Sequence, residues 1–170
     1  MRIIQIFWLA GLGLLSPLGV KAADAVEIKL EFTTQSVVQG KYAPRHVMAV
    51  WVADAQTNYV KTLLRLGQKR QNKLHTWNQA RGSDDRVDGV TGATVAEHQT
   101  HRVLWKGDNA EGKPVPAGQY FLVIEFTENN RQGPLAHVPV QIGGPAGQVT
   151  VSDVAGFKEI KATVSSAAGK

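Results

Sequence analysis

Apolar and polar residues alternate along several short segments of this chain, and a period of two predicts β-strands with one buried face. Residues 26–33, which read Val-Glu-Ile-Lys-Leu-Glu-Phe-Thr, are the first example. The run 46–53 is apolar on both faces, which favours a central strand covered on both sides. Gln56-Thr57-Asn58 then predicts a hairpin turn into a partner strand at 59–66. Further strands are predicted at 99–105, 119–126, 135–142, 149–154 and 157–164.

Seven or eight short strands with turn signals between them predict an all-β chain, folded as an immunoglobulin-like antiparallel β-sandwich. Leu74 and Trp77 have helical spacing, so one short helix is expected near residues 72–81. Residues 82–98 are dense in turn signals and predict a long surface loop, a kind of segment that often carries function. Pro139 has no N–H to donate, so the strand that contains it is expected at a sheet edge.

The amino terminus has the order of a cleavable secretory signal. Met1-Arg2 is followed by an apolar stretch at 3–15 and by the small-residue site Val20-Lys21-Ala22. The apolar stretch is shorter than the roughly 20 residues that a membrane-spanning helix needs. We therefore expect residues 1–22 to be removed and the mature protein to work in the periplasm without stable membrane insertion.

The remaining chain, residues 23–170, is long enough for one hydrophobic core and is expected to form a single domain. Its last part, 155–170, is expected to hold a terminal strand and a frayed tail. Removal of the signal takes away Arg2 and Lys21, so the formal charge falls from +5 to 5 − 2 = +3. An excess this small does not indicate nucleic-acid binding.

The chain contains no cysteine, which excludes several chemistries of exported proteins together. Disulfide bridges, thiolate nucleophiles, iron–sulfur clusters, c-type haem attachment and a lipid anchor on cysteine all need that residue. If this protein handles electrons, its cofactor must be attached in another way.

One long turn connects two predicted strands between Trp105 and Tyr120. Asp108 can bond its own backbone, Gly112 allows a positive φ, and Gly118 leads the chain into the next strand. A calcium loop is disfavoured because oxygen ligands do not stand at the alternate positions that such a loop requires. The segment resembles the strand-turn-strand signature of the immunoglobulin-like domain of flagellar hook-capping proteins.

Together with the central strand and the helix, this turn makes nearly the whole mature chain similar to a family of predicted periplasmic proteins, domain of unknown function 2271. The resemblance implies a single β-sandwich domain and adds more to the fold prediction than to a functional one.

The sharpest chemical signal is the segment Asp88-Gly89-Val90-Thr91-Gly92-Ala93-Thr94. It resembles, at every fixed position, the Asp-x-x-Ser/Thr-Gly-Ala-Ser/Thr motif at which an FAD-dependent FMN transferase attaches FMN through a phosphoester. The resemblance implies that the Thr94 hydroxyl is the acceptor and that Asp88 orients or activates it. Thr91, Gly92 and Ala93 complete the expected cofactor-attachment site. The fixed positions would arise by chance on the order of once in a thousand chains of this length.

We therefore expect a periplasmic redox carrier with FMN covalently attached to Thr94, which exchanges electrons with a membrane-bound redox protein. Such a protein is a carrier and has no substrate turnover of its own. The alternative interpretation is a cofactor-free, immunoglobulin-like binding or assembly module, in which the same segment only makes two tight turns. Both interpretations remain open from the residues.

Aromatic and histidine residues offer further candidates. Trp77, Trp105 or His98 are candidates to stack on a flavin ring, although tryptophans more commonly belong to a core. His98 and His101 lie close together, but their odd spacing sends them to opposite faces of a strand, and only a loop or helix would bring them together. His46 and His75 are too remote in sequence to assign, so no metal site is predicted.

Overall fold

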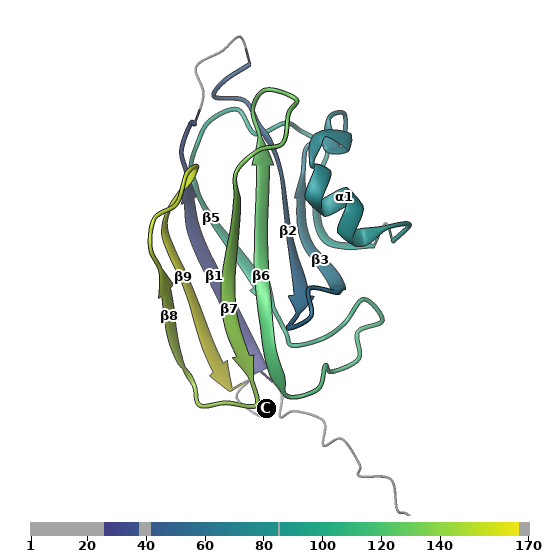
Figure 1. The fold of residues 1–170 in the computed structure, drawn as a ribbon, viewed down its shortest axis with the longest axis vertical. Coiled ribbons are helices and arrows are strands. Elements are labelled where there is room, and N and C mark those ends of the chain that lie inside the picture. The colour runs from purple at the N-terminus through teal and green to yellow at the C-terminus, as the bar shows by residue number, and fades with distance from the viewer. Residues whose placement is uncertain (1–25, 38–41, 85, 167–170) are drawn as a thin grey trace, which may run out of the picture.

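The computed structural model describes residues 26–37, 42–84 and 86–166, and these residues form a two-sheet β-sandwich with one short α-helix (Figure 1). The predicted signal peptide, residues 1–22, lies outside the described residues. The strands are β1 (Val26–Thr34), β2 (Val47–Asp54), β3 (Tyr59–Leu66), β4 (Val87–Thr91), β5 (Thr100–Trp105), β6 (Gly118–Thr127), β7 (Leu135–Ile142), β8 (Gly147–Val151) and β9 (Phe157–Ser166). The helices are the 3₁₀ turn η1 (Gln71–Lys73) and α1 (His75–Arg81).

The two sheets differ in size and in how their strands pair. One has four strands in the order β5-β1-β9-β8, and the other has five in the order β4-β3-β2-β6-β7. Strand β2 is central in the larger sheet, as its doubly apolar sequence predicts, and β7, which contains Pro139, lies at an edge. Pairing is antiparallel except between β3 and β4, which run parallel, so the larger sheet is mixed. The predicted β-sandwich is confirmed.

The main core lies between the sheets. Alternate residues of β1, such as Leu30 and Phe32, face alternate residues of β2 and β6, such as Val50 and Ile124, and all of these are at most 1% exposed. A second apolar cluster lies on the outer face of the larger sheet, where α1 packs against β2 (Figure 1). Its members are Val47, Ala49, Trp51, Ala53, Leu74, Trp77 and Val123. The helix therefore covers the second apolar face of β2.

Helix α1 is held by groups from the sheet beneath it. Its Trp77 is fully buried and donates from Nε1 to Oγ1 of Thr62 on β3, at 2.9 Å. The residue before the helix is Leu74, which has no side-chain oxygen to accept from the first turn. Instead the Glu125 carboxylate of β6 accepts from the backbone N–H of Trp77 at 2.8 Å and of Thr76 at 3.3 Å. Glu125, a residue of β6, thus caps the amino-terminal end of α1.

The predicted loop at 82–98 is wrong in part, because its middle forms β4 beside β3. Leu64 pairs with Gly89 and Leu66 with Thr91 in this parallel ladder. Asp88-Gly89 is read as a turn signal when the sequence is considered alone, but here Gly89 allows close packing. A Cβ on it would lie 3.4 Å from both the carbonyl oxygen of Leu63 and the Cδ1 of Leu64. Among the described residues, 82–84, 86 and 92–98 keep the predicted loop character.

Candidate functional site

The candidate site is the turn that follows β4, at the edge of the larger sheet. Residues Gly92, Ala93 and Thr94 are exposed, and they stand between two stretches of chain that are tied to the rest of the sandwich. Thr91 ends the strand and its Oγ1 lies 3.4 Å from the Ala93 carbonyl. The predicted acceptor hydroxyl therefore lies on an exposed, narrow stretch of backbone with little side-chain bulk beside it.

The chain before this turn is anchored through Asp88 and Lys61. The Lys61 side chain is 7% exposed, and its Nζ lies 2.8 Å from Oδ2 of Asp88 and 3.0 Å from Oδ2 of Asp108. Burial of Lys61 works to lower its pKa, but the hydrogen bonds to the two aspartates outweigh burial and hold the pKa above its ordinary value. The side chain of Asp88, the first residue of the motif, is 51% exposed, so its carboxylate is partly open to solvent.

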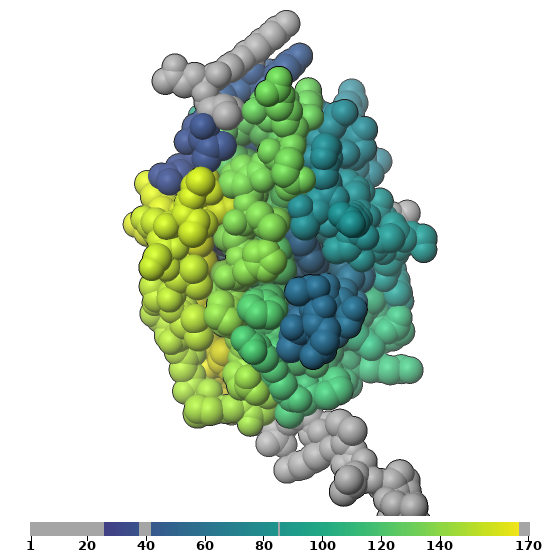
Figure 2. All heavy atoms as spheres, viewed as in Figure 1, coloured from purple at the N-terminus to yellow at the C-terminus, as the bar shows by residue number. Residues whose placement is uncertain are grey.

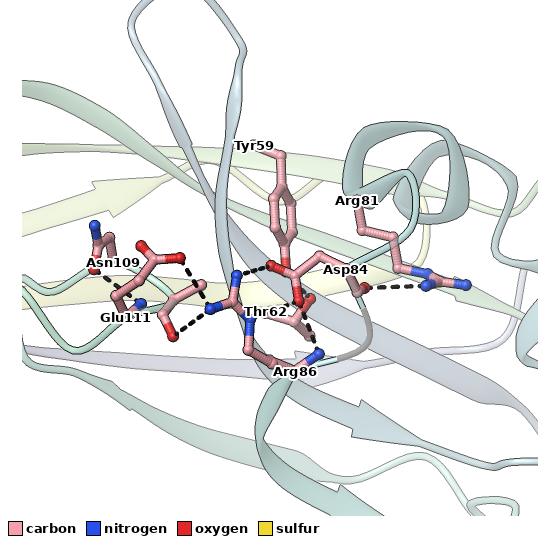
Figure 3. A network of polar contacts seen from close by, with 8 residues as sticks. Tyr59, Thr62, Arg81, Asp84, Arg86, Asn109 and Glu111 are labelled. Atoms are coloured by element: carbon pink, nitrogen blue, oxygen red, sulfur yellow. Dashed lines mark hydrogen bonds and ion pairs between the residues drawn. The ribbon is translucent and has the colours of Figure 1, made fainter.

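A second anchor surrounds Arg86, one residue before β4. Figure 3 shows the Arg86 guanidinium between the carboxylates of Asp84 and Glu111. The distances are 2.7 Å from Nη2 to Asp84 Oδ2 and 2.9 Å from Nη1 to Glu111 Oε1. Because Arg86 and Glu111 are exposed, their ion pair adds little stability, but the network connects the start of β4 to the turn between β5 and β6.

The chain after β4 is anchored by backbone bonds to its neighbours. The N–H of Gly67 donates to the Thr91 carbonyl at 3.0 Å, and the N–H of Gln68 donates to the Gly92 carbonyl at 3.2 Å. Val95 then exchanges two backbone bonds with His46, of 3.0 and 2.9 Å. Thr94 is thus exposed within a segment that is fixed on both sides.

A hollow of about 470 Å³ opens beside Thr94. That volume falls within the range of small-molecule sites. Its walls come from the end of β3, the end of β4 and the segment that leads into β5, and they are more apolar than polar. The lining residues are Leu66, Thr91, Ala93, Thr94, Val95, Ala96, Glu97 and Gln99.

Gly67 fixes how closely the turn approaches β2, and its replacement is expected to disturb the site. Its φ is +89°, and a Cβ there would lie 2.5 Å from Cγ1 of Val47 and 3.6 Å from Cα of Thr94. Gly67→Ala is therefore expected to lower the free energy of unfolding by about 2 kcal/mol more than Gly112→Ala, through overpacking. Gly112 is the matched control because its φ is +73° and nothing lies within 4 Å.

Chemical denaturation of the two glycine variants measures this difference. Equal losses of stability would contradict the close approach of Val47 and Thr94 to Gly67, because both variants carry the same kind of backbone strain.

The structure places the aromatic candidates differently from the sequence prediction. Trp77 and Trp105 are 0% and 1% exposed, so both are core residues and neither is placed to stack on a ligand at the surface. His98 has a side chain that is 15% exposed, and its Nε2 lies 2.8 Å from Oε1 of Glu128.

Three histidines meet near the same end of the sandwich. The ring of His46 stacks on that of His98, with centroids 4.7 Å apart, and lies 6.4 Å from that of His101. His98 precedes β5 and is in a loop, which is why the opposite-face expectation for a strand fails. Sequence reasoning missed His46, whose place at the start of the doubly apolar run was the available signal. Among the described residues, no group of three histidine, aspartate or glutamate side chains is placed to hold a metal ion.

The turn between β5 and β6 differs from its prediction in one residue. Asn109, not Asp108, bonds the local backbone, since its Oδ1 accepts from the N–H of Glu111 and of Lys113 at 3.0 Å each. The Asp108 side chain is directed to Lys61, as described above, and its carbonyl accepts from Nε1 of Trp105 at 2.8 Å. The turn therefore contributes a charge to the site as well as a connection.

Comparison with known proteins gives one match. A family model described as "Predicted periplasmic protein (DUF2271)" matches residues 25–162. No curated protein and no solved structure matches the chain. Among the described residues, no helix has the length and apolar character needed to cross a membrane.

Proposed function

We propose that this chain, which belongs to DUF2271, a family of predicted periplasmic proteins, is an extracytosolic redox carrier with FMN attached covalently to Thr94. The observation that carries the proposal is the exposure of Thr94 on a narrow turn that is fixed on both sides. An acceptor for a modifying enzyme needs such a combination, since the hydroxyl must be accessible and the backbone beside it must fit a transferase site.

The residues around Thr94 fit the proposed attachment. Gly92 and Ala93 have small or absent side chains and are exposed, so a transferase can approach the backbone. Asp88 lies at the start of β4, where Lys61 holds it, and the turn with Thr94 follows the other end of that strand. Asp88 is half exposed and so is accessible to a transferase, in whose site the resemblance assigns it a role in orienting or activating the hydroxyl. The hollow beside Thr94 offers an apolar surface to a planar ring system once the group is tethered.

The attachment step balances with FAD as the donor. The Thr94 Oγ attacks the phosphorus on the FMN side of FAD, a new P–O ester bond forms, and the pyrophosphate P–O bond breaks. AMP leaves with the electron pair, and the hydroxyl proton passes to a base in the transferase site, where the resemblance assigns Asp88 the role of orienting or activating that hydroxyl. The tethered flavin supplies the redox chemistry, while the protein supplies position and surroundings. A membrane-bound redox protein is the proposed electron partner.

Thr94→Ala is expected to abolish flavin attachment and to leave the fold intact, because an exposed hydroxyl contributes little to stability. The test expresses the full chain with an FAD-dependent FMN transferase and its export machinery, then measures intact mass and in-gel flavin fluorescence. Thr94→Ser keeps the nucleophile and is expected to retain the modification, which makes it the matched control.

Two results would overturn the proposal. One is unmodified wild-type protein beside an established acceptor that the same transferase modifies. The other is flavin attachment that persists in Thr94→Ala.

The alternative function is a cofactor-free binding module, and one surface feature favours it. A groove of about 290 Å³ lies on the outer face of the larger sheet between α1 and strands β6 and β7. Figure 2 shows α1, in teal, on the surface beside the green strands. Trp51, Phe121 and Val123 give the groove apolar walls, and His137 adds a polar group. An unmodified Thr94 in the experiment above would leave this function as the better one.

A further inference from the structure

The histidine cluster, defined as His46, His98 and His101 with the carboxylate of Glu128, is a buried set of titratable groups that the proposed function does not use. His46 is 0% exposed, His101 is 7% exposed, and the Glu128 side chain is fully buried. The cluster lies between the sheets, where Phe32 stacks on His101 with centroids 5.3 Å apart and Phe126 lies 5.1 Å from His46. Apolar rings therefore surround these imidazoles.

Hydrogen bonds determine which ring nitrogens carry protons. The Pro44 carbonyl, 2.9 Å from His46 Nδ1, can only accept, so Nδ1 carries the proton and Nε2 is bare in the neutral ring. An ionised Glu128 likewise accepts from His98 Nε2, which leaves Nδ1 of a neutral His98 bare. These two bare nitrogens, and Nε2 of His101, are buried without a hydrogen-bond partner. Such unpaired groups are uncommon in folded proteins.

The stacked arrangement of the histidine rings favours binding of a proton over binding of a metal ion. The rings of His46 and His98 are nearly parallel, with 8° between their planes. The nitrogen lone pairs lie in the planes of the two rings. In parallel stacked rings these lone pairs do not point to a common position between the rings, which binding of one metal ion between them would require.

Charge in the cluster is already limited by its surroundings. Burial lowers the pKa of His46, with smaller contributions from His98 and Arg70, and this outweighs the hydrogen bond to the Pro44 carbonyl and the charge of Glu128, which raise it. Burial and the neighbouring histidines lower the pKa of His101 to about 4. Burial would raise the pKa of Glu128, but hydrogen bonds from His98, Ser36 and the Val37 N–H hold it below its ordinary value. Glu128 can therefore balance one positive charge, and it is the acidic group of the described residues that acts on these rings, while Arg70 and the neighbouring histidines oppose a second proton.

The cluster is joined directly to the segment that carries Thr94. Val95, the residue after Thr94, exchanges both backbone bonds with His46. His98 belongs to the same segment and is fixed by its stacking on His46 and its bond to Glu128. Gln99 then pairs through its backbone with Thr34, at 3.1 Å and 3.2 Å. The histidine cluster thus holds the middle of residues 92–99 to the sandwich, while Gln68 and Thr34 hold the two ends of the segment.

We propose that the histidine cluster is a proton-sensitive clasp that holds residues 92–99 against the sandwich when His46 and His101 are neutral and releases them when acid protonates the cluster. The sign follows from the burial of these rings. When residues 92–99 open, the rings of His46 and His101 meet solvent and take up protons from the ordinary histidine value of 6.5 downward, whereas in the closed form burial lowers the pKa of His101 to about 4. The closed form is therefore at full stability above pH 6.5 and loses it as the pH falls toward 4.

Hydrogen–deuterium exchange of residues 92–99 at pH 7 and pH 5 tests the clasp. After correction for intrinsic exchange, opening is expected to be about 20-fold more favourable at pH 5, as calculated for one histidine with this shift. His101→Phe keeps the ring against Phe32 and removes the titration, so the pH dependence is expected to fall to a few-fold. His137→Phe is the matched control, since burial also lowers the pKa of His137 but it lies on β7, away from the segment.

Two outcomes would overturn the clasp. One is wild-type exchange in residues 92–99 that does not change between the two pH values, or that changes equally in His101→Phe. The other is stoichiometric binding of added Zn²⁺ or Cu²⁺ that His46→Ala removes, because the cluster would then be a metal site. The protein is produced without the FMN transferase, so the result is independent of whether Thr94 accepts FMN.

Discussion

Glu125→Ala is expected to lower the free energy of unfolding by about 4 kcal/mol, which is a large part of the 5–15 kcal/mol that keeps a typical domain folded. The carboxylate is fully buried and accepts from the N–H groups of Thr76 and Trp77 and from Nε2 of Gln132, the last at 2.9 Å. Alanine leaves these donors without an acceptor and leaves a cavity beneath α1. Urea denaturation at neutral pH, followed by tryptophan fluorescence, measures the loss.

Glu125→Gln is the matched control for this prediction. The amide keeps the shape and one acceptor oxygen, but its NH₂ group cannot accept from Trp77, so a loss of about 2 kcal/mol is expected. Burial raises the pKa of Glu125 above its ordinary 4.5, against the hydrogen bonds from Trp77, Thr76 and Gln132. The folded state thus binds the proton of Glu125 more tightly than the unfolded chain does. The difference in unfolding free energy between wild type and Glu125→Gln is therefore expected to shrink as the pH rises above 4.5. An alanine variant as stable as wild type would show that the helix needs no cap from β6.

The double variant Asp88→Asn/Asp108→Asn is expected to lose about 3 kcal/mol, more than the sum of its single variants, at about 1 kcal/mol each. Each aspartate alone still balances the charge of Lys61, whose side chain is 7% exposed. When both are neutral, the ammonium is buried without a counter-charge. A double-mutant cycle at neutral pH measures this coupling, and additive losses would contradict it.

Lys61→Met in the double-variant background is expected to recover most of that loss, since it removes the buried charge at similar volume. The pH dependence distinguishes the two states of Lys61. In wild type its pKa is raised, so its contribution is full below the ordinary 10.5 and is lost as the pH rises through the folded-state pKa. In the double variant burial alone remains and lowers the pKa, so stability is expected to rise with pH up to about 10.5.

Local patterning accounts for much of the fold. The alternation in residues 26–33 and the doubly apolar run at 46–53 predicted β1 and β2 to within one residue at each end. The hairpin turn at Gln56-Thr57-Asn58 joins β2 to β3 as predicted, and β3 has the predicted bounds of 59–66. These elements were predictable because each buries its apolar residues through a period that the neighbouring residues alone display.

The candidate site was only partly visible in this way. The motif residues Asp88 to Thr94 are the basis of the flavin-attachment hypothesis. Their turn-like composition predicted a loop and not the strand β4, because the pairing partner β3 lies more than 20 residues earlier. Lys61, which holds Asp88, stands in a strand-like run with nothing local to mark it. The place of His46 at the start of the doubly apolar run was a signal, but it does not reveal the pairing with Val95. Their roles depend on which distant groups the fold places beside them.

By itself, the sequence determined that this chain forms a β-sandwich with one short helix, because strand periods and turn residues are local properties of the chain. Tertiary structure alone decided that Glu125 caps α1, that β4 extends the sheet and that three histidines share one buried cluster. Each of these depends on contacts between residues far apart in sequence. A buried polar group needs a hydrogen-bond partner, and that partner can lie anywhere in the sequence, so a local pattern does not predict it.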